Sequence, residues 1–161
     1  KILAAGGSVQ TKTKRGNYNA IHYAASFGFD TIIEQLIAYK VDINTRDSDG
    51  ETALMKAALY NKLSSVNALL IAGNQVNAQN KYGGTALTVA ASNGFNDVVA
   101  QLLNKGADAD LRTQSGNSAL ILAAAKNYAN VCTTLLSYDA FTEFENENSV
   151  FALYAAADAN H

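Results

Sequence analysis

Residues 50–76, GETALMKAALYNKLSSVNALLIAGNQV, decide the fold. This stretch combines a turn glycine, a Thr-Ala-Leu helix start, a pair of alanines, a break at Asn61 and a second run that ends in Leu69 and Leu70. The same order returns in residues 83–109, GGTALTVAASNGFNDVVAQLLNKGADA, a step of 33 positions (83 against 50). A fixed period of this size is typical of stacked repeats, so the sequence predicts a repeat architecture.

The period continues along the whole chain. It is marked by five leucines in one phase, Leu3, Leu36, Leu69, Leu102 and Leu135. The predicted full units are residues 11–43, 44–76, 77–109 and 110–142, with partial units 1–10 and 143–161 at the ends. No linker or second composition class interrupts them, so we expect a single domain over residues 1–161.

Each full unit is predicted to be a polar turn followed by two short antiparallel helices. In the second unit, Thr52 is expected to cap the first helix by accepting from backbone N–H groups two or three residues on. Asn61 is expected in the break between the helices, since asparagine visits the left-handed region. The paired alanines, such as Ala57 and Ala58, let the first helices stack closely, while larger side chains fill the second layer.

The second helices carry apolar stripes. In the first unit the stripe follows the i, i+1, i+4, i+5 spacing of a helix face and comprises Ile32, Ile33, Leu36 and Ile37. Leu135 and Leu136 hold the corresponding place in the fourth unit. We expect all of these side chains to face inward.

Composition excludes several classes of protein. The formal net charge of -2 provides no global basic field for nucleic acid. The one cysteine, Cys132, excludes an intrachain disulfide framework and a multi-cysteine zinc site, and we expect it to pack within a helix. No run of 18 apolar residues predicts a membrane span, and no signal peptide opens the sequence. We expect no membrane insertion and a cytoplasmic location.

The motifs DSDGETALMKAA, GGTALTVAASNGFNDVVAQLLNKGADAD and SGNSALILAAAKN resemble the ankyrin repeat. Alanine replaces the family proline in every unit, and among the helix-start positions only His22 keeps the family histidine, which helps to tie neighbouring loops. The resemblance implies an all-α ankyrin-repeat solenoid of helix-turn-helix units joined by β-hairpin-like loops. It also implies that the first helices line a concave surface.

The resemblance further implies non-catalytic recognition of another protein through the concave face and the fingertips, with no cofactor and no metal. The partner-binding residues that it implies are Arg15, Tyr18, Phe27, Ser48, Asp49, Glu51, Tyr60, Lys81, Tyr82, Asn93, Gln114, Asn117 and Lys126. Tyr18, Phe27, Tyr60 and Tyr82 are favoured as anchors, because rigid aromatic side chains bury much area at low entropic cost. The alternative for Phe27 and Tyr60 is plain packing between adjacent units.

Other functions stay open as alternatives. An enzyme within these residues is disfavoured, because no acid, base and nucleophile set can be assembled, and His22 is expected to be structural. The chain can instead be the targeting module of a larger enzyme or secreted effector whose catalytic domain lies outside it. A basic first finger (Lys12, Lys14, Arg15) and an acidic segment after Tyr138 predict a charge gradient. An ordinary solvated surface is the favoured interpretation of this gradient, and the alternatives are steering of a partner and self-association through open repeat ends.

Overall fold

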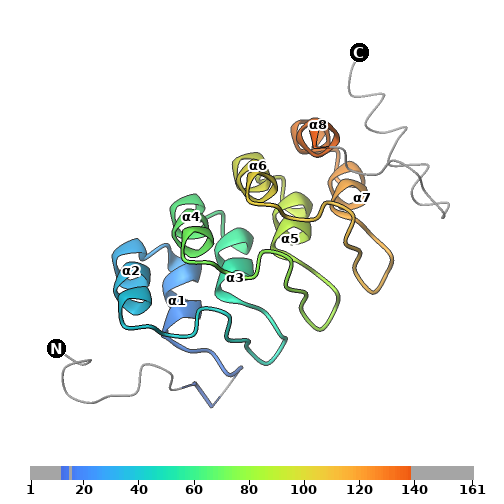
Figure 1. Ribbon diagram of the computed structural model, residues 1–161. Helices are drawn as coiled ribbons and strands as arrows, with labels where there is room; N and C mark the ends of the chain where they lie inside the picture. Colours follow the sequence, from blue (N-terminus) through green and yellow to red (C-terminus); the bar gives the residue numbers. More distant parts are fainter. Residues whose placement is uncertain (1–11, 15, 139–161) are drawn as a thin grey trace. The chain divides into compact units, whose positions relative to one another are not determined.

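The computed structural model describes residues 12–14 and 16–138 (Figure 1). The chain divides into two compact units, residues 1–75 and 76–161, which we call the first unit and the second unit to distinguish them from the shorter predicted repeats. Several predictions lie outside the described residues: the place of Leu3 in the leucine phase, the role of Arg15, the acidic segment after Tyr138 and the partial units 1–10 and 143–161. The expectation of a single domain, with the repeat boundaries given above, stays a prediction.

The first unit contains two helix pairs. The first pair is α1 (Ala20–Phe27) and α2 (Asp30–Ala38), and the second is α3 (Ala53–Leu59) and α4 (Leu63–Ile71). Within each pair the helices contact each other, and between the pairs α1 packs on α3 and α2 on α4. Small first-layer residues and larger second-layer residues therefore form two layers, as the sequence predicts.

The second unit repeats this arrangement. Its helices are α5 (Ala86–Ser92), α6 (Asn96–Asn104), α7 (Ala119–Ala124) and α8 (Ala129–Ser137), with α5 on α7 and α6 on α8. Residues 12–14 and 16–138 contain no β-strand. The loops before α3, α5 and α7 are turns, and each is closed by a backbone hydrogen bond, from Asp47 to Glu51, from Asn80 to Gly84 and from Thr113 to Asn117, in agreement with the expected hairpin-like form.

The predicted helix boundaries follow from side-chain caps. The Oγ1 atom of Thr52 accepts a hydrogen bond from the Met55 backbone N–H at 3.3 Å, as expected. Equivalent caps begin the other first helices, at Asn19, Thr85 and Ser118. Asn61 has φ of 53° in the break between α3 and α4, which confirms its left-handed conformation.

The repeated apolar positions form the core. The described leucines of the 33-residue phase are all buried: Leu36, Leu69, Leu102 and Leu135. The alanine pairs are buried as well: Ala24 with Ala25, Ala57 with Ala58, Ala90 with Ala91, and Ala123 with Ala124. Cys132 is also buried, and burial raises the pKa of its thiol, in agreement with a packing role.

The expectation that the whole apolar stripe faces inward is wrong at two positions. Ile32 is 44% exposed and Leu136 is 39% exposed. The repeat position of Ile32 faces the second helix of the preceding pair, as Ser65 of α4 shows by its bond to Asp30 of α2. Among the described residues, α1 and α2 form the first helix pair, so no helix of an earlier pair covers Ile32. Leu103, at the position of Leu136 in the previous repeat, is buried on α6, which α8 covers, whereas no described helix follows α8.

The turns before the first helices are closed by side chains. In the first unit, Oδ1 of Asp47 accepts from the backbone N–H groups of Asp49 (2.8 Å) and Glu51 (2.9 Å). The Ser48 N–H donates to the Gly16 carbonyl of the neighbouring turn at 2.9 Å. These bonds hold the turns of two successive repeats together and set the position of the residues that follow them.

Candidate functional site

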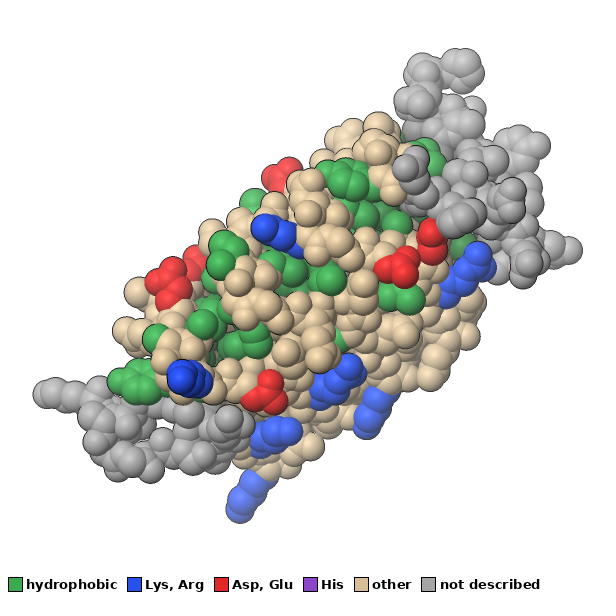
Figure 2. Space-filling view, in the orientation of Figure 1, with side chains coloured by type: hydrophobic (Ala, Val, Ile, Leu, Met, Phe, Trp, Pro, Cys, Tyr) green, Lys and Arg blue, Asp and Glu red, His purple; other side chains and the backbone are tan. Residues whose placement is uncertain are grey.

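A cavity of about 440 Å³ lies in the first unit, beside α1 and α3. Its lining residues are Tyr18, Tyr23, Ser26, Phe27, Lys56, Tyr60 and Lys62. The structure thus brings together Tyr18, Phe27 and Tyr60, three of the aromatic residues that the sequence favoured as partner anchors. In the view of Figure 2, hydrophobic side chains of the chain show as separate patches among polar ones.

The aromatic side chains of this cavity support one another. The Tyr18 and Tyr23 rings lie 5.4 Å apart, tilted by 43°, and Phe27 stacks on Phe29 at 5.6 Å. Phe27 and Tyr60 are 60% and 54% exposed, so both side chains are accessible to a partner. The cavity therefore offers a rigid, accessible aromatic surface.

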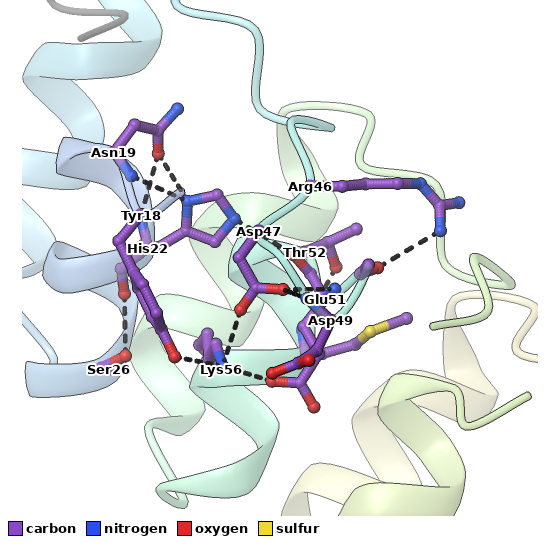
Figure 3. A network of polar contacts seen from close by, with 12 residues as sticks. Tyr18, Asn19, His22, Ser26, Arg46, Asp47, Asp49, Glu51, Thr52 and Lys56 are labelled. Atoms are coloured by element: carbon purple, nitrogen blue, oxygen red, sulfur yellow. Dashed lines mark hydrogen bonds and ion pairs between the residues drawn. The ribbon is translucent and has the colours of Figure 1, made fainter. Parts of the chain in front are cut away.

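Lys56 forms the polar floor of the cavity. It lies on α3, is only 5% exposed and extends toward Tyr18 (Figure 3). Its ammonium nitrogen donates to the Tyr18 hydroxyl at 2.8 Å, lies 3.0 Å from Oδ2 of Asp47 and forms an ion pair with Glu51. Two of these contacts are hydrogen bonds, to Tyr18 and Glu51, and the third is an ion pair with Asp47. Lys56 therefore joins α3 to the turns before α1 and α3.

The charges in this cluster are stabilised by their partners. Burial lowers the pKa of Lys56, but hydrogen bonds to Glu51, Tyr18 and Asp47 outweigh burial, and the pKa is raised overall. Burial raises the pKa of Asp47, but hydrogen bonds from Lys56 and from the backbone of Glu51 and Asp49 outweigh it and hold the pKa below its ordinary value. Lys56 and Asp47 are therefore both charged at neutral pH.

His22 links α1 to the same turn. Its Nε2 atom lies 3.1 Å from the Glu51 carbonyl, which can only accept, so Nε2 donates there. The Asn19 backbone N–H lies 3.3 Å from Nδ1, which closes the cap of α1. The side chain is fully buried, and burial lowers the pKa of His22 below its ordinary value. These contacts agree with the expected structural role.

The other predicted residues of the first unit lie in its turn rather than in the cavity lining. Ser48 and Asp49 occupy the tip, where their backbone N–H groups bond to Gly16 and Asp47. Glu51 forms an ion pair with Lys56 and does not line the cavity. The structure therefore separates the predicted set into lining residues and residues that position the lining.

In the second unit, three predicted residues meet at the turns. The Gln114 side chain donates to the Lys81 carbonyl at 2.7 Å, and the Gln114 backbone N–H donates to the Tyr82 carbonyl at 2.9 Å. The Tyr82 ring is exposed there. This group forms a small exposed surface at the tips of two successive turns.

The remaining predicted residues of the second unit are engaged with its backbone. The Asn93 side chain donates to the Val89 carbonyl at 2.8 Å, and the Lys126 ammonium donates to the Ser92 carbonyl. The Asn117 carbonyl accepts from Thr113 at 3.0 Å. Their contacts order the ends of α5 and α7 and the turn before α7.

Sequence reasoning missed four lining residues: Tyr23, Ser26, Lys56 and Lys62. One signal could have found Tyr23 and Lys56. Tyr23 precedes Phe27, and Lys56 precedes Tyr60, by four positions, so each pair shares one helix face. Lys62 occupies the helix break, where the repeat pattern carries no information about side-chain direction.

Two site types are absent from the described part of the chain. No group of three or more His, Cys, Asp or Glu side chains among residues 12–14 and 16–138 could hold a metal ion. Within the same residues, no helix is long and apolar enough to cross a membrane.

Comparison with known families matches ankyrin repeats, in three copies, over residues 1–80 and 54–148. The chain belongs to the ankyrin-repeat family. Its fold is an all-α ankyrin-repeat solenoid, which confirms the expected fold class, and ankyrin repeats are protein–protein interaction modules. The cavity of the first unit therefore belongs to a scaffold that is typically used for binding rather than for catalysis.

Two curated proteins share part of this ankyrin sequence. Calmodulin-binding transcription activator 3 of Arabidopsis thaliana is 31% identical over 71 residues, 44% of this chain and 7% of that protein. A probable E3 ubiquitin-protein ligase of Oryza sativa subsp. japonica is 38% identical over 56 residues, 35% of this chain and 11% of that protein. The chain thus matches only a small part of either relative's length.

Proposed function

We propose that this chain is a non-catalytic binding module that recognises a partner protein through the cavity of its first unit. The observation that carries the proposal is the aromatic lining of that cavity by Tyr18, Tyr23, Phe27 and Tyr60. Preformed aromatic surfaces are typical anchor points of protein interfaces, because they bury large areas without ordering flexible side chains.

The Lys56 network supports this reading. A pocket contributes most to affinity when its walls are already in the binding geometry, because no ordering cost remains to be met. The hydrogen bond from Lys56 fixes the Tyr18 hydroxyl, and the ion pairs with Asp47 and Glu51 fix Lys56. Tyr82, on the exposed turns of the second unit, is proposed as a further contact.

A second candidate function is that of a targeting module in a longer protein with its own catalytic domain. The matches to 7% and 11% of two much longer relatives favour this candidate. The two candidates are compatible, because targeting also requires partner binding. Self-association through the repeat ends and a cytoplasmic location stay predictions.

The experiment is a comparative capture from extracts of the source cells, with immobilised wild type, Tyr60→Ala and Tyr39→Ala. Tyr39 ends α2, is 60% exposed and does not line the cavity, so it matches Tyr60 in type and exposure. We expect at least one protein whose recovery falls about tenfold with Tyr60→Ala and is unchanged with Tyr39→Ala. Equal recovery of every captured protein with all three baits would mean that the partner binds to a surface other than this cavity.

A further inference from the structure

The polar groups that line the cavity of the first unit are hydrogen-bond donors with a positive charge among them. The lining contains two lysines, three tyrosines, one serine and one phenylalanine, and no carboxylate. The Ser26 hydroxyl is engaged with the His22 carbonyl at 2.8 Å. The remaining lysine and tyrosine groups determine which ligand chemistry fits.

Of the two lysines, only Lys62 is available to a ligand. Lys56 is buried, donates hydrogen bonds to Tyr18 and Glu51 and forms an ion pair with Asp47. The ammonium of Lys62, by contrast, has no ion pair or hydrogen bond to any of the described residues 12–14 and 16–138.

The stem of Lys62 is held in place by packing. A Cβ atom placed on Gly28 would lie only 3.0 Å from Cδ of Lys62, so the lysine stem lies against the backbone at the end of α1. Lys62 itself is half-buried. The charge is therefore presented beside the cavity without the large entropic cost of ordering a free lysine.

Tyr18 supplies a second donor. Its hydroxyl oxygen accepts from Lys56 at 2.8 Å, so its own hydrogen remains to be donated. A ligand group that meets both Tyr18 and Lys62 must accept hydrogen bonds, and the charge of Lys62 favours an anion.

The neighbouring cavity differs from the first because a carboxylate lies in its lining. This second cavity, of about 350 Å³, shares Phe27 and Lys62 with the first and also contains Asp30. Oδ1 of Asp30 accepts from the Ser65 hydroxyl at 2.6 Å. Phe27 and Lys62 thus separate an aromatic, carboxylate-free cavity from one that already holds a carboxylate.

We propose that the first cavity binds an acidic peptide segment of the partner, in which an Asp or Glu adjoins an aromatic side chain. The aromatic side chain packs against Tyr23, Phe27 and Tyr60, and the carboxylate accepts from Lys62 and the Tyr18 hydroxyl. The charge complementarity of Lys62 selects this occupant over a basic segment, which the same ammonium repels. The inference rests on the proposed function and specifies its partner chemistry.

The test is an NMR titration of the intact, ¹⁵N-labelled chain with three synthetic peptides. They share the pattern acetyl-Gly-X-Phe-X-Gly-amide, with X as glutamate, glutamine or lysine. We expect the glutamate peptide to bind about threefold or more tighter than the glutamine peptide at low salt, and the lysine peptide to bind most weakly. The amide shifts should centre on Tyr18, Phe27 and Lys62.

Two variants test whether the preference for the glutamate peptide depends on the charge of Lys62. Lys62→Gln should remove the preference for glutamate over glutamine, whereas Lys105→Gln, an exposed lysine of the second unit, should keep it. Equal binding of the glutamate and glutamine peptides to the wild type would overturn the proposed preference for a carboxylate, while the proposed packing of an aromatic side chain in the cavity would stand. No shift with any peptide at millimolar concentration would overturn the peptide inference as a whole. The proposed function is judged separately, by the comparative capture.

Discussion

The ammonium of Lys56 donates to the hydroxyl of Tyr18 at 2.8 Å, across 38 positions of sequence. This bond joins helix α3 to the loop before α1 and sets one wall of the candidate site. Burying a lysine is costly unless its charge is paired, and here Asp47 and Glu51 supply the pairing. One side chain therefore serves both the stability of the first unit and the shape of its cavity.

Replacing Lys56 tests the stability role. Lys56→Met keeps the stem but leaves Asp47 and Glu51 as buried or half-buried carboxylates without their cation. We expect a loss of about 3 kcal/mol in the free energy of unfolding, measured by urea titration with circular dichroism. Lys105→Met, at an exposed position, should change it by less than about 0.5 kcal/mol. Similar losses in both variants would mean that the network contributes nothing specific.

The buried His22 makes stability depend on pH. Its folded pKa is lowered from the ordinary value of 6.5, so as the pH falls below that value the unfolded chain takes up a proton that the folded chain does not. The wild type should therefore lose up to about 1.4 kcal/mol per pH unit from this group between pH 6.5 and its lower folded pKa. His22→Gln should show a flatter profile by urea titration, and an identical slope would contradict the burial effect.

The exposed tyrosines of the two units should carry binding. Tyr60→Ala combined with Tyr82→Ala should weaken binding of a captured partner by at least about tenfold, since aromatic anchors typically contribute more than 1 kcal/mol each. The helical circular dichroism should stay intact, because both side chains are exposed. Isothermal titration calorimetry measures the affinity, with Tyr39→Ala as control. An unchanged affinity would place the interface on another surface.

The leucine of the repeat core should be sensitive to truncation. Leu102 is fully buried on α6, so Leu102→Ala should cost about 2–5 kcal/mol through the cavity that it leaves. Leu136→Ala, at a position that is 39% exposed on α8, should cost less than about 1.5 kcal/mol. Urea unfolding of the two variants provides the comparison, and a reversed order would contradict the assignment of the core.

Gly94 and Gly106 have nearly the same φ angle, so alanine substitutions at the two positions distinguish the cost of backbone strain from the cost of a steric clash. Gly94 has φ of 75° and Gly106 has φ of 80°, so alanine is strained at both. A Cβ on Gly94 would also lie 2.9 Å from the Tyr128 ring, whereas nothing lies within 4 Å at Gly106. Gly94→Ala should therefore lower the free energy of unfolding by about 1 kcal/mol more than Gly106→Ala. Equal losses in thermal or urea unfolding would show that Tyr128 moves aside freely.

The fold could be predicted from the sequence because the residues that specify it recur in every repeat. Thr52 caps its helix as predicted, Asn61 takes the left-handed conformation, and the described leucines of the 33-residue phase are buried. Each of these features depends on local backbone chemistry or on a position that every unit shares. Ile32 and Leu136 are exposed although their repeat positions predict burial, because a repeat position is buried only where a neighbouring helix pair covers it on the correct side.

Only part of the candidate site could be predicted from the sequence. Phe27 and Tyr60 were predicted from their places at the ends of the first helices, and they do line the cavity. Lys56 and Lys62 were missed, because a lysine in a repeat is expected to point to solvent. Nothing in the local sequence distinguishes Lys56, which is buried among three polar partners, from Lys62, which has no partner in the described part of the chain.

The sequence by itself determined the repeat, its helices, its caps and its family, because a 33-residue period constrains every unit in the same way. Only the tertiary structure decided that Lys56 meets Asp47, Glu51 and Tyr18, and that Lys62 lies beside the aromatic side chains without a partner among residues 12–14 and 16–138. The physical reason is that pairing and desolvation of a charge depend on which turns lie next to each other in space. A period records where units recur, whereas the contacts between their variable positions arise only when the units stack.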